Sequence, residues 1–235
     1  MKQNIKWEEL LQMFCASEDV RLWMTKPFLN KCYDKVWATD GHAVLMVNPE
    51  VCNAKYDMLS KSLTCLEAIR KQDDGPILTV QDMKQLLTRF PREEEMEKSC
   101  KKKPCPECHG DGTVTWHYLS GRQSYSAEYN CPECDGRGVI VEETLHPTGR
   151  MLLAQDVAVR IGNSLFRALE IERLWKAADM IGVSEVRLLH LPKPNTLGTD
   201  GALLSLSPDI HLLLASFFVE DESKIETLPI KFKED

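Results

Sequence analysis

The stretch CPECHGDG, residues 105–112, recurs as CPECDGRG at residues 131–138, with 22 residues between Cys108 and Cys131. Two residues between paired cysteines let both thiolates face one ion, and zinc prefers four soft ligands in a tetrahedron. The doubled spacing therefore predicts a finger that binds one structural zinc ion. Its expected ligands are Cys105, Cys108, Cys131 and Cys134.

The glycines of each copy fit a tight turn around the metal. Gly110 and Gly112, like Gly136 and Gly138, follow the second cysteine of their pair at two and four residues. Glycine adopts positive φ angles without a steric cost, which allows backbone N–H groups to approach the sulfur atoms. We expect these amides to stabilise the thiolate charge.

The segment between the two copies is expected to form a β-hairpin. Residues 113–119 (TVTWHYL) are rich in β-branched and aromatic side chains, residues 120–123 (SGRQ) suit a turn, and residues 124–130 can return as a second strand. The two CxxC turns would then lie at the base of the hairpin.

The nine cysteines also allow other arrangements. An accidental spacing of free or disulfide-linked cysteines is one alternative, and His109 or His117 as a substitute ligand is another. Four cysteines already complete a tetrahedral site, which leaves no position for catalytic water. Cys100, five residues before Cys105, could compete for the metal. The remaining cysteines are expected to be small core residues or exposed residues without a specific role: Cys15, Cys32, Cys52, Cys65 and Cys100.

The CxxCxGxG pattern resembles the cysteine-rich domain of DnaJ chaperones, in which four copies bind two zinc ions and contribute to the handling of unfolded protein. Only two copies are present here, over about 35 of 235 residues. The His-Pro-Asp signature of J-proteins is absent, because His146-Pro147 is followed by Thr148. The resemblance therefore concerns the finger and not the whole chain.

The sequence before the finger contains signals for a helix, a strand and a hairpin. Residues 7–14 suit an amphipathic helix, residues 20–22 (VRL) suit a strand, and residues 36–47 suit a hairpin that turns at Asp40-Gly41. The charged stretch at residues 91–103 is interpreted as a linker into the finger, and residues 142–149 as the way out.

The sequence after the finger repeats these signals in the same order. Residues 171–181 suit a helix, residues 186–188 (VRL) a strand, and Thr199-Asp200-Gly201 a turn before a second apolar run. A shift of 166 residues superposes the two VRL segments but leaves the turns six residues apart. A chance match of common elements remains an alternative to an internal repeat.

The helix, strand and Ala38-to-Gly41 hairpin resemble the repeating unit of DNA sliding clamps, in which two units make one domain. The resemblance implies an α+β body whose strands form an outer sheet and whose helices line the DNA-facing side. The expected domains are an N-terminal unit at residues 1–95, a linker and inserted finger at 96–149, and a C-terminal unit at 150–235 that pairs with the first. A ring around DNA would need several copies or other clamp subunits.

The charge distribution favours a protein partner over direct nucleic-acid binding by the finger. The chain has a net charge of -7, and residues 104–138 hold two basic side chains against five acidic ones. Four thiolates around a divalent ion would add a further -2, and phosphate binding requires a basic surface. Positive charge adjoining the finger comes from one cluster: Lys98, Lys101, Lys102 and Lys103. This cluster is either a route to DNA or a solvated linker.

No catalytic motif is found in the sequence. There is no Walker pattern, no HExxH cluster and no GxSxG turn. Asp40 and Asp200 are interpreted as turn residues before glycine rather than as a catalytic pair. Six scattered histidines are expected to be structural or exposed: His42, His109, His117, His146, His190 and His211. Five tryptophans are expected to anchor packing: Trp7, Trp23, Trp37, Trp116 and Trp175.

Composition and patterning indicate a cytoplasmic chain, since 43% of residues are hydrophobic, 28% are charged, and no apolar run approaches the roughly 18 residues of a membrane helix. The leading hypothesis is a non-enzymatic, zinc-binding interaction protein with a clamp-like body, acting in DNA replication or repair. The competing hypothesis is a chaperone-like protein whose finger binds exposed peptide. An enzyme whose site has no recognisable motif is the third.

Overall fold

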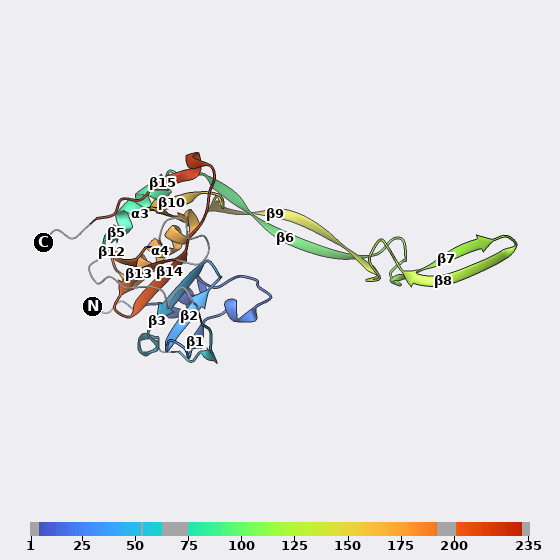
Figure 1. The fold of residues 1–235 in the computed structure, drawn as a ribbon, viewed down its shortest axis with the longest axis horizontal. Coiled ribbons are helices and arrows are strands. Elements are labelled where there is room, and N and C mark those ends of the chain that lie inside the picture. The colour runs from blue at the N-terminus through green and yellow to red at the C-terminus, as the bar shows by residue number, and fades with distance from the viewer. Residues whose placement is uncertain (1–4, 53, 63–74, 192–200, 232–235) are drawn as a thin grey trace. The chain divides into compact units, whose positions relative to one another are not determined.

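The computed structural model describes residues 5–52, 54–62, 75–191 and 201–231. The chain divides into two compact units. We call Met1–Arg92 together with Leu153–Asp235 the body, and Glu93–Leu152 the insert (Figure 1). The described chain is mixed, mostly sheet with few helices, so the expectation of a chain built from both helices and strands is confirmed.

An eight-stranded sheet forms the centre of the body (Figure 1). Its middle is the antiparallel pairing of β3 with β14, in which Val47 lies opposite Ile210 and Ala43 opposite Leu214. The sheet therefore joins strands from both sides of the insert. Its order is β4 (Asp57–Leu59), β1 (Phe28–Asn30), β2 (Lys35–Thr39), β3 (Ala43–Val47), β14 (Ile210–Ala215), β13 (Gly201–Ser207), β12 (Glu185–His190) and β5 (Ile77–Thr79).

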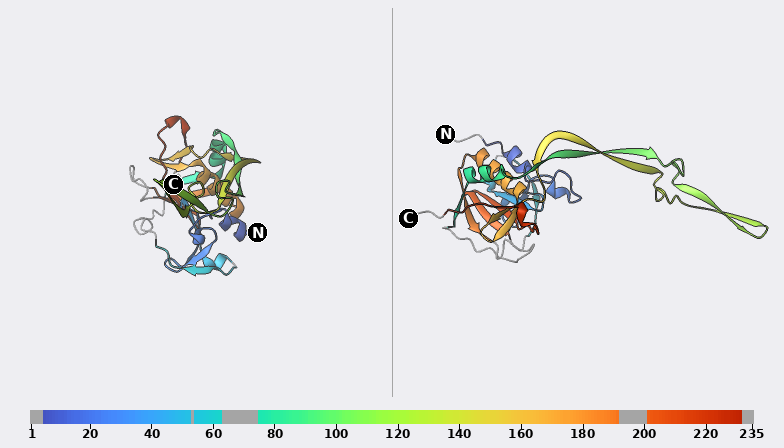
Figure 2. Two further views of the ribbon diagram at one scale, coloured as in Figure 1. Left: turned by 90° about the vertical axis from the view of Figure 1, so that its right-hand side faces the viewer. Right: turned by 90° about the horizontal axis from the view of Figure 1, so that it is seen from above.

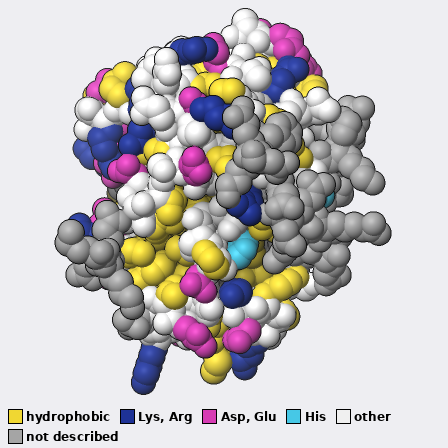
Figure 3. Space-filling view, turned by 90° about the vertical axis from the view of Figure 1, so that its left-hand side faces the viewer, with side chains coloured by type: hydrophobic (Ala, Val, Ile, Leu, Met, Phe, Trp, Pro, Cys, Tyr) yellow, Lys and Arg dark blue, Asp and Glu magenta, His cyan; other side chains and the backbone are white. Residues whose placement is uncertain are grey.

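Side chains alternate between the two faces of this sheet, as the pleat requires. In β3, Ala43, Leu45 and Val47 belong to the main core, whereas Val44 and Met46 belong to a smaller apolar cluster on the other face. The main core is completed by apolar side chains of α1 (Trp7–Gln12), α3 (Val80–Leu87) and α4 (Ala168–Ile181). Figure 3 shows hydrophobic side chains gathered on one face of the molecule, with charged side chains around them.

Local interactions fix the start of α3 and the end of α4. The Thr79 hydroxyl caps α3 by accepting a hydrogen bond from the Asp82 amide, and Gly182 ends α4 in the left-handed conformation. A three-stranded sheet precedes and flanks α4. It consists of β11 (Ser164–Arg167), β10 (Ala158–Ile161) and β15 (Ile225–Thr227). The described part of the body also contains three short 3-10 helices: η1 (Leu22–Met24), η2 (Pro49–Val51) and η3 (Glu222–Lys224).

Two of the expected elements of the first half are present and one is not. The hairpin turning at Asp40-Gly41 joins β2 to β3, and the first helix is present but ends at Gln12. The expected strand at residues 20–22 is wrong, because Val20 is 98% exposed and Leu22 begins η1. The Asp19 carboxylate accepts hydrogen bonds from the backbone and side chain of Arg21, which favours a local turn over sheet pairing.

The repeat relates different elements from those that the sequence suggested. The strand order is symmetric about the β3–β14 pair, so that β1, β2 and β3 correspond to β12, β13 and β14. The Asp40-Gly41 turn therefore corresponds to the turn between β13 and β14, and not to Thr199-Asp200-Gly201. Residues 199 and 200 lie outside the described residues. The superposition of the two VRL segments is wrong for the same reason, since only residues 186–188 lie in a strand.

The insert consists of two paired ribbons (Figure 2). Strands β6 (Arg92–Pro104) and β9 (Val139–Leu153) form the first. Strands β7 (Thr113–Ser120) and β8 (Gln123–Asn130) form the second, an antiparallel hairpin that runs from Thr113 opposite Asn130 to Ser120 opposite Gln123. The sequence predicted this hairpin.

Most of residues 91–103 and 142–149, interpreted from the sequence as the linker into the finger and the way out, lies in the paired strands β6 and β9. Ion pairs join the two strands in reversed order: Lys103 to Glu142 at 2.6 Å and Glu95 to Arg150 at 2.8 Å. Opposite charges placed across neighbouring strands support pairing, so the charge run that suggested a solvated linker also suits a ribbon.

No helix in the described part of the chain is long and apolar enough to cross a membrane.

Candidate metal centre

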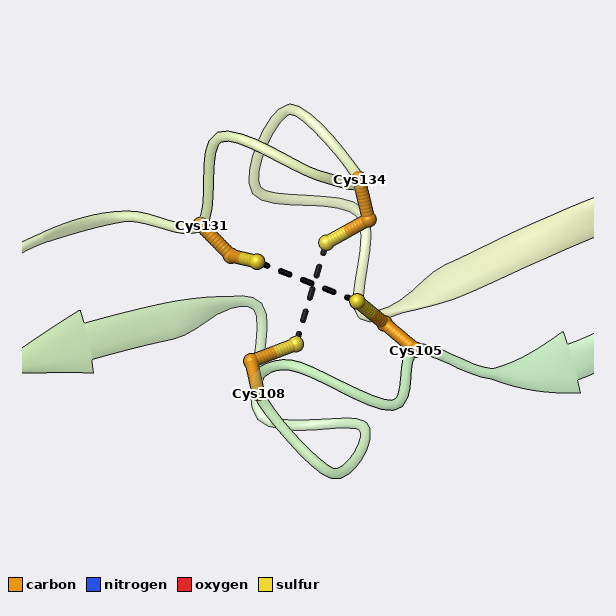
Figure 4. A group of neighbouring side chains, drawn as sticks. All are labelled: Cys105, Cys108, Cys131 and Cys134. Atoms are coloured by element: carbon orange, nitrogen blue, oxygen red, sulfur yellow. Dashed lines mark hydrogen bonds between the residues drawn. The ribbon is translucent and has the colours of Figure 1, made fainter.

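The structure brings four cysteine side chains together between the two ribbons of the insert (Figure 4). The Sγ atoms of Cys105 and Cys131 lie 3.8 Å apart, and those of Cys108 and Cys134 lie 3.7 Å apart. All four Sγ atoms lie within 4.8 Å of one another, and all four residues are buried. Each CxxC pair contributes one sulfur atom to each of these two contacts.

These distances fit a tetrahedral metal site. A disulfide bond requires about 2.05 Å between sulfur atoms, so the cysteines are not bonded to one another. Zinc–sulfur bonds of about 2.3 Å in a tetrahedron place the sulfur atoms about 3.8 Å apart. The donor set and its spacing are therefore those of a site for one metal ion, although they do not identify the metal.

Two equivalent turns hold the sulfur atoms in place. The Gly112 amide donates a hydrogen bond to Cys108 Sγ, and the Gly138 amide donates one to Cys134 Sγ, both at 3.2 Å. The expected approach of glycine amides to the thiolates is confirmed. Such donors stabilise a negative sulfur atom and orient it toward the ion.

The same glycines connect one turn to the other. The Cys105 amide donates to the Gly138 carbonyl at 2.9 Å, and the Cys131 amide donates to the Gly112 carbonyl at 2.8 Å. Gly138 has φ +72°, and a Cβ there would lie 2.3 Å from the carbonyl oxygen of Gly110. Both its backbone conformation and the lack of space require glycine.

Local interactions give the thiols of this cluster different pKa values. Burial raises the pKa of Cys108, but hydrogen bonds from the Gly112 and Gly110 amides outweigh it and bring the pKa to about 7. Burial raises the pKa of Cys131 to about 11 in spite of its backbone hydrogen bonds. A divalent ion would displace the remaining thiol protons when it binds.

The alternative ligands lie outside this cluster. Within the described residues, the group of potential ligands contains the four cysteines and no histidine. His109 and His117 are exposed, and so is Cys100 on β6. Cys15 and Cys52 are buried in the body, where burial raises the pKa of each thiol to about 11, as expected for core residues. Cys65 lies outside the described residues.

The body contains a charged cluster that the sequence did not indicate. The Arg173 guanidinium on α4 pairs with the carboxylates of Asp40 and Glu170, and all three side chains are largely buried. Burial would raise the pKa of Asp40, but Arg173 and the amides of His42 and Ala43 lower it. Burial raises the pKa of Glu170. Asp40 is thus a turn residue, as predicted, that also connects the first half to α4.

Half of the lysine cluster beside the finger is ion-paired. Lys98 contacts Glu143 at 3.1 Å and Lys103 contacts Glu142 at 2.6 Å, all with exposed side chains. These pairs reduce the positive charge that residues 98–103 present to a phosphate backbone. The histidines show no clustering among the described residues that would suggest a catalytic or metal site.

No protein-family model matches the chain, and no curated protein matches it. Among solved structures it is similar to the DNA polymerase III subunit beta from Pseudomonas aeruginosa, with 13% identity, a TM-score of 0.41 and 93% of this chain covered. It is also similar to the C. crescentus beta sliding clamp, with 11% identity, a TM-score of 0.39 and 92% of this chain covered. The chain spans 65% of the length of each of these proteins.

Proposed function

We propose that this chain is a non-enzymatic interaction protein in which one structural zinc ion holds the insert together for contact with a protein partner. The observation that carries the proposal is the set of four buried cysteine sulfur atoms spaced as ligands of one ion. Four protein ligands complete a tetrahedral ion and leave no open position for water or substrate. A structural role therefore suits this site better than a catalytic one.

Zinc is proposed over other metals because of the ligand type. Four thiolates in a tetrahedron suit zinc or iron, whereas oxygen ligands would be needed for magnesium or calcium. The ion would also stabilise the insert, which is small. Within the insert each ribbon is a two-stranded sheet with no further layer of its own, so the cross-link between the two CxxC turns would stabilise the base of the β7–β8 hairpin.

For the body we propose a clamp-like platform acting in DNA replication or repair. Support comes from the motifs of the sequence and from a sheet that combines strands of both halves, with α3 and α4 packed together on one face. The exposed side chains of these helices include Gln81, Gln85, Lys176 and Asp179, which do not form a strongly basic surface. Protein docking is therefore proposed as the main activity, and DNA binding as a property to be tested.

A chaperone-like activity is the second candidate, favoured by large apolar side chains that the insert leaves exposed. It predicts that the purified chain suppresses aggregation of an unfolded protein at stoichiometric concentrations. Binding to duplex DNA that weakens steeply as salt is raised, without such suppression, would support the clamp-like proposal, and the absence of both results would leave a protein-docking platform.

Metal analysis of the purified chain tests the central proposal. We expect about one equivalent of zinc per chain, lost in Cys105→Ser with Cys134→Ser and retained in Cys100→Ser, whose thiol lies outside the cluster. Less than about half an equivalent of zinc after careful handling, or one equivalent of iron, would overturn the assignment. Unchanged zinc in the double variant would do the same.

A further inference from the structure

One face of the β7–β8 hairpin carries a ladder of exposed aromatic rings. Side chains alternate along each strand, and the register pairs Tyr118 with Tyr125 and Trp116 with Ala127. We call this surface the aromatic face and define it by Val114, Trp116, Tyr118, Tyr125, Ala127 and Tyr129. The four aromatic residues are exposed to 59% for Trp116, 67% for Tyr118, 53% for Tyr125 and 58% for Tyr129.

The rings contact one another in pairs and leave a hollow between them. Trp116 and Tyr129 meet edge to face with centroids 6.2 Å apart, and Tyr118 and Tyr125 lie tilted at 6.4 Å. The small side chain of Ala127 lies between the two pairs, and the hollow they line has a volume of about 700 Å³. Cross-strand contacts of this kind stabilise a hairpin, yet each of the four aromatic residues is more than half exposed.

This exposure corrects the expectation for Trp116. The sequence predicted a packing anchor, but a two-stranded ribbon has no second layer that could cover the ring. Exposed tryptophan and tyrosine side chains gathered in one patch are typical of interaction surfaces, since each ring offers a large apolar area and a polar tip.

The charge around the aromatic face favours a cation. The face itself has no charged side chain, and the hairpin holds one Arg122 and one Glu128, which lies on the opposite face. The turns at its base carry exposed Glu107, Asp111 and Glu133. Asp111 precedes Val114 by three residues, which can span at most about 10 Å, so the two lie within the distance over which salt screens charge.

A metal ion bound by four thiolates would add to this negative potential. The site would carry a net charge of -2 at the end of the hairpin where Tyr129 and Trp116 lie. A phosphate backbone would therefore be repelled from the rings nearest the two CxxC turns, whereas a positively charged side chain would be attracted to the negative faces of the same rings.

We propose that the aromatic face docks an arginine-bearing segment of a protein partner, with a guanidinium group stacked on Trp116 and Tyr129. Arginine is chosen over lysine because its planar, weakly hydrated head stacks on aromatic rings. The inference rests on the proposed protein-docking function and assigns that function a surface and a partner chemistry. Loss of the cation–π contact is expected to weaken binding about tenfold.

Fluorescence anisotropy with the zinc-loaded full chain tests this inference. The probes are a fluorescein-labelled (Arg-Gly)4 peptide, the same peptide with lysine or with neutral citrulline in place of arginine, and a 12-residue oligothymidylate. We expect binding of the arginine peptide, weaker binding of the lysine peptide and none of the citrulline peptide. Trp116→Leu with Tyr129→Leu should weaken arginine-peptide binding about tenfold.

Two variants separate loss of the rings from loss of the fold. Trp116→Phe with Tyr129→Phe keeps two aromatic faces and should retain most of the affinity, and Thr115→Ala, on the opposite face, should change nothing. Each variant must retain its full metal content to be compared. Equal binding of arginine and citrulline peptides, equal affinity in the leucine double variant, or tighter binding of the oligothymidylate would each overturn the inference. A chain that holds zinc but binds no arginine peptide overturns this inference and leaves the structural zinc intact.

Discussion

Replacing Arg173 by methionine should destabilise the body more than any other single loss of an ion pair described above. Arg173 is 19% exposed, and its two partners, Asp40 and Glu170, are 13% and 3% exposed. Arg173→Met keeps a long apolar side chain but removes the guanidinium that pairs with both buried carboxylates, leaving His42 beside Asp40 and Arg167 near Glu170 as the remaining basic neighbours. Breaking a buried pair in this way costs about 3–5 kcal/mol of unfolding free energy, a large part of the roughly 5–15 kcal/mol that holds a domain folded.

The size of the body converts this cost into a change in melting temperature. The body has 92 residues before the insert and 83 after it. For a domain of this size 1 kcal/mol corresponds to about 2–4 °C, so Arg173→Met should lower the Tm by roughly 6–20 °C. Differential scanning calorimetry at pH 7 measures it. Arg89→Met is the matched control, because Arg89 is 57% exposed in its pair with Glu226 and should cost less than about 1 kcal/mol.

The pH dependence gives an independent check. In the parent, Arg173 holds the pKa of Asp40 below its ordinary value, so this contribution is complete above that value and is lost as pH falls through the folded pKa. Without Arg173, burial would raise the pKa of both carboxyl groups, and protonation would relieve the variant. The Tm difference should therefore be greatest at pH 7 and shrink toward about pH 4. Equal Tm losses for Arg173→Met and Arg89→Met, or a difference that grows in acid, would show that the buried ion pairs of Arg173 do not stabilise the body as described.

Three further outcomes are expected. Gly138→Ala should weaken zinc binding at least about tenfold in a chelator competition, because a Cβ would clash with the Gly110 carbonyl oxygen. Gly121→Ala is the control, since Gly121 has φ +62° but open space around it, and zinc affinity should change little. Similar losses of zinc affinity in both variants would contradict the clash. Removing zinc with a chelator should abolish amide-exchange protection in the β7–β8 hairpin without moving the Tm of the body, and a simultaneous loss of both would show that the units are coupled. Leu45→Ala, in the centre of the sheet, should lower the free energy of unfolding by about 2–5 kcal/mol in a urea titration. Val20→Ala, at an exposed site, should change it by less than about 0.5 kcal/mol. A comparable loss at Val20 would indicate that residues 20–22 are buried in a strand after all.

Features whose partners lie within a few residues were predictable. The hairpin at residues 113–130 could be predicted from its β-branched and aromatic strands and its glycine turn. The Asp40 turn could be predicted because its carboxylate accepts hydrogen bonds from amides two and three residues away. The prediction of a strand at residues 20–22 was wrong because strand formation also depends on a distant pairing partner. Apolar side chains alone do not make a strand when no neighbouring strand is available to pair with them.

Features that depend on distant partners were not predictable. Asp40 and Arg173 are separated by 133 residues, and neither carries a local signal of the other. The ribbon of β6 and β9 was missed because its evidence is the matching of charges across two strands about 45 residues apart, while each strand alone resembles a solvated charge run. The correct pairing of elements in the repeat likewise depended on which strands meet at β3 and β14.

The four-cysteine group and its two turns follow from local sequence, because the ligands, the glycines and the amides that support them occur within eight consecutive residues of each copy. How the two copies meet, which glycine faces which carbonyl, and which aromatic residues remain exposed on the hairpin between them depend on the folded chain. Turn geometry is set by neighbouring residues, whereas burial, pairing and charge environment depend on which distant segments the fold brings close.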